Sequence, residues 1–134
     1  MIDKGINIAR WVDDILKKIE LVTEESVVRL TNPSVSEIGF KDGVKLSEIY
    51  KKASSQQLRI VHPQVALEFL LWHGDGLEVG QWIILAMEPI TDSVGALVVL
   101  RVGRHSGSLW LSASFGRPDD FWDGVNQFFF SVAN

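Results

Sequence analysis

The N-terminal part of the chain carries hydrophobic residues at helical spacing. They are Ile8, Trp11, Val12, Ile15, Ile19 and Val22. This spacing places them on one face of a helix. On the opposite face, Asp13 and Asp14 each precede a lysine by one helical turn, which is a stabilising arrangement. The pattern predicts an amphipathic helix from about Lys4 to Leu21 whose apolar face covers the core.

Residues 23–44 carry conflicting signals. Thr23 with the two glutamates after it is typical of a helix start. The β-branched residues at 27 and 28 favour a strand, and turn residues follow near Pro33 and Gly43. The segment is therefore predicted as either a short helix or a strand.

Two more helices are predicted in the middle of the chain, at residues 45–54 and 64–72. A short strand is expected between them, at residues 58–61. Pro63 suits the first turn of the second helix, and Gly74 suits its end. That helix is apolar on most sides, which predicts that it is buried.

Residues 81–115 show the shorter period of β-strands. Turn residues divide them into strands at 81–88, 96–102 and 109–115, which predicts an antiparallel meander. The first two strands are apolar on both faces, so both faces should be covered. In the third, Trp110, Ser112 and Ser114 alternate with apolar residues, which predicts one dry and one wetter face.

The C-terminal segment is predicted to form a helix over residues 118–131. Pro118 and Asp119 suit its first turn. A stripe formed by Phe121, Val125, Phe128 and Val132 would face the core. Phe130 falls on the polar side of this helix, which predicts an exposed aromatic ring.

These elements predict one α+β domain spanning residues 1–134. About four helices would pack on a three- to four-stranded, mainly antiparallel sheet. If the N-terminal helices pack against the end of the sheet, one sheet face stays open. A second copy of the chain would then cover it, so a homodimer is expected.

Composition narrows the classes of function. All seven lysines lie at or before Lys52, and ten of the thirteen aromatic residues follow Gln56. Since lysine is the readiest residue for a solvated surface, much of the second half should be covered or buried. The net charge of −4 argues against a nucleic-acid-binding protein, which needs a basic stripe.

The chain has no cysteine, which excludes disulfides, thiolate catalysis and cysteine-ligated metal sites. Its longest apolar runs, Trp82–Met87 and Ala96–Leu100, are far shorter than the roughly 18 residues that cross a membrane. The N-terminus lacks the apolar region of a secretory signal. We expect a soluble, cytoplasmic protein with no cofactor, no bound metal and no membrane or nucleic-acid partner.

Candidate binding chemistry is sparse. His73 and Asp75 flank a glycine turn, where an aspartate could orient an imidazole. The competing interpretation is an ordinary helix-ending turn. Arg101, Arg104 and His105 gather near the predicted hairpin and could hold a phosphate or carboxylate. Equally, these residues could simply keep an exposed hairpin tip soluble.

Aromatic residues supply the other candidates. Trp110, Trp122 and Phe130 are predicted interface residues, because interface centres are rich in aromatic side chains and poor in lysine. The favoured hypothesis is a non-enzymatic protein-interaction or regulatory module. The alternative is a small-molecule-binding protein or small enzyme, with a pocket near His73, Asp75 and the Arg104–His105 hairpin.

Overall fold

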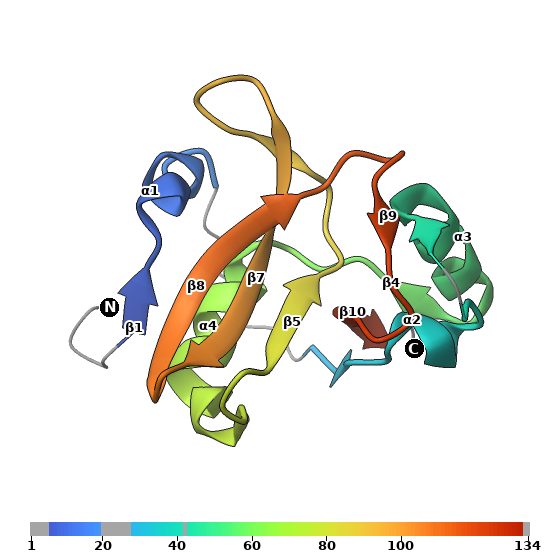
Figure 1. Ribbon diagram of the computed structural model, residues 1–134, viewed down its shortest axis with the longest axis horizontal. Coiled ribbons are helices and arrows are strands. Elements are labelled where there is room, and N and C mark those ends of the chain that lie inside the picture. The colour runs from blue at the N-terminus through green and yellow to red at the C-terminus, as the bar shows by residue number, and fades with distance from the viewer. Residues whose placement is uncertain (1–5, 20–27, 42, 133–134) are drawn as a thin grey trace.

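The structure is a computed structural model that describes residues 6–19, 28–41 and 43–132 (Figure 1). This part of the chain contains four α-helices: α1 (Arg10–Leu16), α2 (Val35–Ile38), α3 (Leu46–Ser55) and α4 (Gln64–His73). A short 3-10 helix, η2 (Gly74–Gly76), follows α4. The strands are β1 (Ile6–Ile8), β2 (Leu30–Thr31), β3 (Val44–Lys45), β4 (Leu58–Arg59), β5 (Trp82–Leu85), β6 (Ile90–Thr91), β7 (Leu97–His105), β8 (Ser108–Phe115), β9 (Phe121–Trp122) and β10 (Gln127–Val132).

Most of the strands form one mixed sheet. In the described residues it has eight strands, with the order β1-β8-β7-β5-β10-β2, and with β4 beside β10 and β6 beside β7. Two pairs are parallel, β1 with β8 and β5 with β10, while the others are antiparallel. In the same part of the chain, β3 and β9 form a separate two-stranded sheet. The predicted three- to four-stranded, mainly antiparallel sheet is therefore wrong, because the sheet is larger and mixed.

The predicted C-terminal helix over residues 118–131 is also wrong. This segment forms β9 and β10, and β10 lies between β5 and β2 inside the sheet. The run Phe128-Phe129-Phe130 is buried on both faces of its strand. A short, continuous apolar run suits such a central strand as well as it suits a helix, and long-range pairing decides between them.

The N-terminal helix is shorter than predicted. Residues 6–8 form β1, which pairs in parallel with β8, and helix α1 begins only at Arg10. Ile6 is buried while Asn7 is exposed, which is the alternation of a strand. Both ends of the predicted Lys4–Leu21 helix, residues 4–5 and 20–21, lie outside the described residues. Within the ambiguous 23–44 segment, the described part contains both kinds of element, because β2, α2 and the first residue of β3 all fall there.

Local prediction is confirmed for the two middle helices and for the β7–β8 hairpin. Helices α3 and α4 lie within about one residue of their predicted bounds. Leu109, Leu111 and Ala113 are buried, while the residues between them are half-buried. The predicted burial of α4 holds only on one side, because Trp72 is 75 % exposed.

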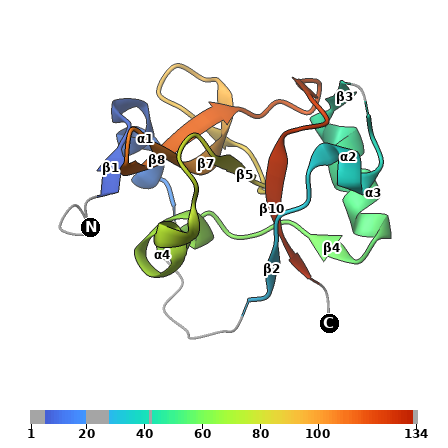
Figure 2. The same ribbon diagram turned by 60° about the horizontal axis from the view of Figure 1, so that its bottom comes forward.

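The helices are unevenly distributed around the sheet. Helix α4 packs on β7 and β8 from one side. Figure 2 shows α2 and α3 together at the other end of the molecule, beyond β10. In Figure 1, strands β5, β7 and β8 face the viewer with no helix in front of them. None of the described helices is long and apolar enough to cross a membrane.

Candidate functional site on the open face of the sheet

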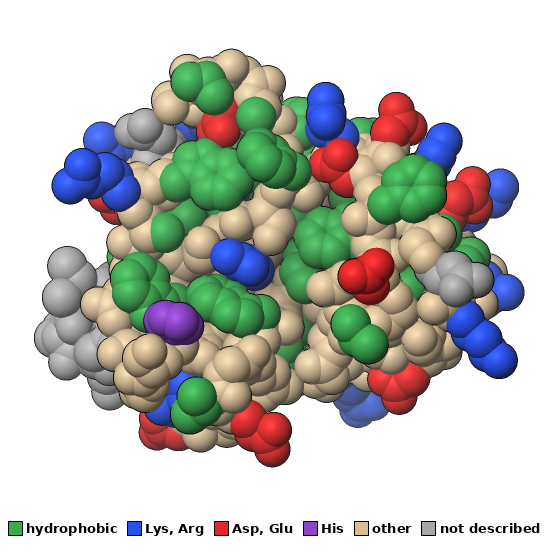
Figure 3. All heavy atoms as spheres, in the orientation of Figure 1, with side chains coloured by type: hydrophobic (Ala, Val, Ile, Leu, Met, Phe, Trp, Pro, Cys, Tyr) green, Lys and Arg blue, Asp and Glu red, His purple; other side chains and the backbone are tan. Residues whose placement is uncertain are grey.

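The side of β5, β7 and β8 that α4 leaves uncovered carries a compact set of half-buried side chains. We call it the open face and define it by Trp82, Arg101, Trp110, Ser112 and Ser114. Strand register places these residues in adjacent rows, because Arg101 lies between Ile84 and Ser112. In the next row, Gly103 lies between Trp82 and Trp110. Figure 3 shows hydrophobic side chains around a basic side chain at this place.

Gly103 leaves room for the Trp82 ring against the backbone of β7. A Cβ atom at position 103 would collide with the Trp82 indole and would lie 2.8 Å from the backbone oxygen of Gln81. The ring therefore occupies the space that any other residue at 103 would fill. The indole extends across β7, toward the strand that carries Trp110.

Arg101 packs against the Trp82 ring. Its guanidinium carbon lies 4.2 Å from the ring centroid, which is a cation–π contact. The ring and the guanidinium stack face to face in many such pairs, because both groups are planar. The Trp82 indole thus lies against Gly103 of β7 and also contacts the Arg101 guanidinium.

None of the described residues accepts a hydrogen bond from the Arg101 guanidinium. Its Nε–H is buried and makes no hydrogen bond in the described structure. No carboxylate among the described residues forms an ion pair with it either. Burial lowers the pKa of Arg101 below its ordinary value. A buried donor without a hydrogen bond is energetically unfavourable, so the Nε–H of Arg101 is an unsatisfied group on the open face.

Trp122 carries the other unpaired donor among the described buried groups. Its indole N–H is buried without a partner, and its ring packs edge-on against Phe128 at 5.1 Å. Phe128 is the register neighbour of Ile84 across the β5–β10 pair, and Ile84 is the neighbour of Arg101. Trp122 therefore lies beside the β10 end of the row that contains Arg101.

The five predicted binding residues do not form one cluster. Arg104 and Asp75 come together, with 3.9 Å between Nη2 and the carboxylate, but Asp75 is fully exposed. Arg104 donates from Nε to the Leu77 carbonyl at 2.8 Å, and from Nη1 to the Gly107 carbonyl at 3.2 Å. These bonds tie the hairpin to the end of α4 and occupy much of the donor capacity of Arg104.

The other predicted residues lie apart from that contact. His73 is exposed at the end of α4, and its ring lies 6.1 Å from that of Phe69. Arg101 is three residues before Arg104 on β7, so the two side chains point to opposite faces. His105 is exposed at the hairpin end of β7, on the Arg101 side by the same alternation. A binding role for these residues stays a prediction.

The predicted interface residues also differ in their positions. Trp110 is half-buried on the open face, and Trp122 is half-buried beside Phe128. Phe130 is only 1 % exposed, so its expected exposure is wrong. That expectation depended on the helix over residues 118–131, whereas Phe130 belongs to the buried strand β10.

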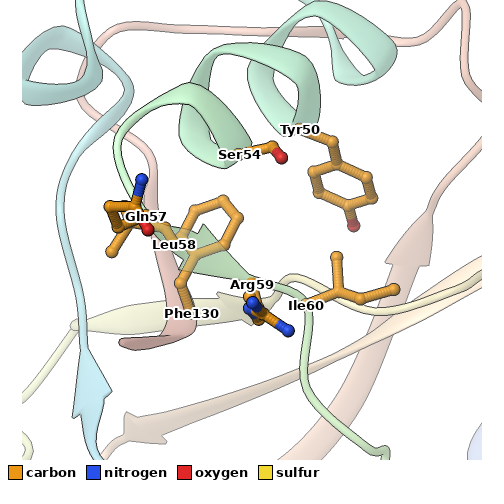
Figure 4. Close-up of a pocket in the computed structure, with 7 residues that line it drawn as sticks. All are labelled: Tyr50, Ser54, Gln57, Leu58, Arg59, Ile60 and Phe130. Atoms are coloured by element: carbon orange, nitrogen blue, oxygen red, sulfur yellow. The ribbon is translucent and has the colours of Figure 1, made fainter. Parts of the chain in front are cut away.

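Phe130 instead forms part of a shallow pocket between α3 and β4, with a volume of about 480 Å³. Figure 4 shows Tyr50 and Ser54 projecting from α3, with Arg59 and Ile60 below them. The Tyr50 hydroxyl is already engaged, because it donates to the Met87 carbonyl at 3.0 Å and accepts from the Met87 N–H at 3.1 Å. The pocket size is within the range of small-molecule sites, but its polar groups do not converge on one point.

No group of three or more His, Asp or Glu residues in the described part of the chain could hold a metal ion. A comparison of the chain with protein-family models, with curated protein sequences and with solved structures finds no significant match. Functional inference for this protein therefore depends on the geometry of the open face.

Three residues of the open face, Trp82, Ser112 and Ser114, are not among the sequence-based candidates, and neither is the adjacent Gly103. The sequence predicts Trp82 only as part of a strand that is covered on both faces. Side chains alternate between the two faces of a strand, so the sequence spacing alone indicates that Arg101 and Arg104 point to opposite faces. By contrast, nothing in the sequence indicated that Trp82 lies opposite Gly103, because that register depends on how β5 pairs with β7.

Proposed function

We propose that this protein is a non-enzymatic protein-interaction module that binds its partner through the open face. The observation that supports this most strongly is the Arg101 guanidinium, which is stacked on Trp82 without an acceptor. A partner that supplies an acceptor would satisfy this group and cover the adjacent rings.

The composition of the open face agrees with a protein partner. Tryptophan and arginine are the residues that most often dominate binding energy at the centre of protein interfaces. Lysine is depleted there, and the open face lies in the half of the chain that lacks it. Ser112 and Ser114 add small polar groups that can exchange water for partner contacts.

Affinity capture with paired tryptophan variants tests the proposal. Trp110→Ser removes a ring from the open face, whereas Trp72→Ser removes an exposed ring from α4, outside this face. We expect wild type and Trp72→Ser to capture the same protein from an extract of the source cells, and Trp110→Ser to lose it. If Trp72→Ser loses the captured protein and Trp110→Ser retains it, the interface lies on α4 instead.

The expected homodimer stays a prediction beside this proposal. A second copy of the chain is the simplest cover for an open sheet face. Light scattering of the purified protein measures it directly. The charge on the open face, considered below, favours a different chain as the occupant.

The small-molecule alternative, with its site near Asp75 and Arg104, ranks second. Arg104 is bonded to backbone carbonyls at the end of α4, and this arrangement supports a structural role. Such a role predicts that Arg104→Lys lowers stability and leaves partner capture unchanged. A ligand-dependent shift of the His105 resonances in wild type, absent in Arg104→Lys, would instead support the alternative.

A further inference from the structure

We infer that the partner presents a carboxylate to Arg101, from an acidic side chain or a chain terminus that has an apolar residue beside it. This inference rests on the proposed function and specifies the partner's chemistry. The open face, as defined above, carries a cation and two indole rings, but no carboxylate. Charge complementarity therefore selects a negatively charged group for the centre of the contact.

The hydrogen-bonding geometry of Arg101 favours a planar anion. Its Nε is buried without a partner, whereas its terminal nitrogens are not among the buried unpaired atoms and make no hydrogen bond within the described structure. A guanidinium presents parallel N–H donors that match both oxygens of a carboxylate. The contact with Trp82 holds Arg101 in place before the partner arrives, which reduces the entropy lost on binding.

A carboxylate fits this site better than a nucleic-acid backbone. Nucleic acid carries a phosphate at every nucleotide, and its affinity depends on several basic residues acting together. Arg101 is the only lysine or arginine in the set that defines the open face. The whole chain has a net charge of −4, which opposes a polyanion.

Apolar contacts would supply the remaining recognition. Trp82 and Trp110 are half-buried on either side of Gly103, where no side chain separates them. An aliphatic or aromatic residue next to the carboxylate can cover both rings while the carboxylate meets Arg101. Because water is then displaced from around the ion pair, the charge-assisted hydrogen bonds gain strength.

A second copy of this chain is a poor occupant for the same reason. In a two-fold symmetric dimer, equivalent patches face each other. The two Arg101 guanidiniums would then approach one another with no acidic residue from either open face between them. Like charges in such a contact are unfavourable, so the partner should be a different protein segment.

The first test uses phenylacetate and its uncharged analogue phenylacetamide as probes in NMR titrations. We expect phenylacetate to shift the Arg101 Nε–H and Trp82 indole N–H resonances to saturation. Phenylacetamide should bind about tenfold more weakly, because it lacks the charge-assisted hydrogen bonds. Equal affinity of the two probes, or no saturable shift with either, would overturn the carboxylate assignment.

Variants of Arg101 and Arg59 show which of the two sites binds phenylacetate. Arg101→Met keeps an apolar stem and should abolish the response to phenylacetate, while Arg101→Lys keeps the charge and should weaken it. Arg59→Met removes an exposed arginine that lines the separate α3–β4 pocket and should change nothing. Thermal unfolding of Arg101→Met should show a midpoint close to that of wild type, because no internal hydrogen bond of the guanidinium is lost and the methionine can still pack against Trp82. A response to phenylacetate that survives Arg101→Met and disappears with Arg59→Met would place the site in the pocket instead.

The second test uses short random peptides displayed on phage. We expect selection on wild type, with counter-selection on Arg101→Met, to enrich peptides that carry Asp or Glu beside an aliphatic or aromatic residue. Replacing the acidic residue with its amide should weaken binding by about 30-fold or more, as expected for a buried charge pair. Enriched peptides that bind in a Trp110-dependent way without any carboxylate would refute this inference and leave the proposed function standing. Tighter Arg101-dependent binding of a single-stranded oligonucleotide would instead indicate a nucleic-acid partner.

Discussion

At the residue scale, Tyr50 gives a direct readout of packing between α3 and Met87, which follows strand β5. It is the only tyrosine of the chain, so its ionisation can be followed by tyrosinate absorbance. Burial raises the pKa of Tyr50 to about 12, although the hydrogen bond to the Met87 backbone partly opposes the shift. We expect the native protein to titrate near this value, and the unfolded chain near the ordinary value of about 10.

This difference sets the sign of a pH effect on stability. Between about pH 10 and 12 the unfolded chain loses the tyrosine proton while the folded protein keeps it, so the free energy of unfolding falls as pH rises. The total loss should be about 2–3 kcal/mol, and Tyr50→Phe should remove this pH dependence. At neutral pH the same variant should be less stable by about 1–3 kcal/mol, because the Met87 N–H loses its acceptor. A native tyrosinate midpoint near 10 would contradict the buried position.

At the element scale, the register of β5 against β7 sets the open face through Gly103. Gly103→Ala should lower the free energy of unfolding by about 1–3 kcal/mol, because the methyl group must displace the Trp82 ring. Gly76→Ala is the matched control: a Cβ there meets nothing within 4 Å, so its effect should stay within about 0.5 kcal/mol. Urea unfolding followed by tryptophan fluorescence compares the two, and equal stabilities would argue against the stacked position of Trp82.

The burial of strand β10 leads to a second prediction at this scale. Phe130→Ala should reduce stability by about 3–5 kcal/mol, because the ring is buried next to Phe128 and Tyr50. Phe121→Ala removes a ring that is 66 % exposed on β9 and should change stability by no more than about 0.5 kcal/mol. Chemical unfolding monitored by circular dichroism measures the free energy of unfolding of both variants. If a C-terminal helix existed instead, the larger loss would fall on Phe121, which would face the core.

At the scale of the whole molecule, the open face bears on the oligomeric state. We expect wild type and Trp110→Ser to have the same mass by light scattering, because two Arg101 side chains oppose symmetric pairing through this face. A wild-type dimer that becomes a monomer in Trp110→Ser would show that a second copy occupies the open face. A dimer that persists in the variant would use another surface and leave the open face for its partner.

The accuracy of sequence-based prediction differed between segments for a physical reason. Helices α3 and α4 and the β7–β8 hairpin are determined by nearby residues, through helical periodicity, turn residues and strand alternation. The burial of Leu109, Leu111 and Ala113 followed from alternation alone. The Phe128–Phe130 run was compatible with two periods, and only its pairing with β5, which lies more than forty residues earlier, selected the strand.

The candidate site shows the same difference between features set by neighbouring residues and features set by distant contacts. The sequence by itself determined that Trp110 lies on the wetter face of its strand and that the second half of the chain lacks lysine. Only the tertiary structure decided that Trp82 lies over Gly103, that Arg101 stacks on this indole without an acceptor, and that α4 covers one side of the sheet. Alternation and composition are properties of neighbouring residues and can be read along the chain. Strand register and helix placement depend on contacts between distant segments, which local patterns do not specify.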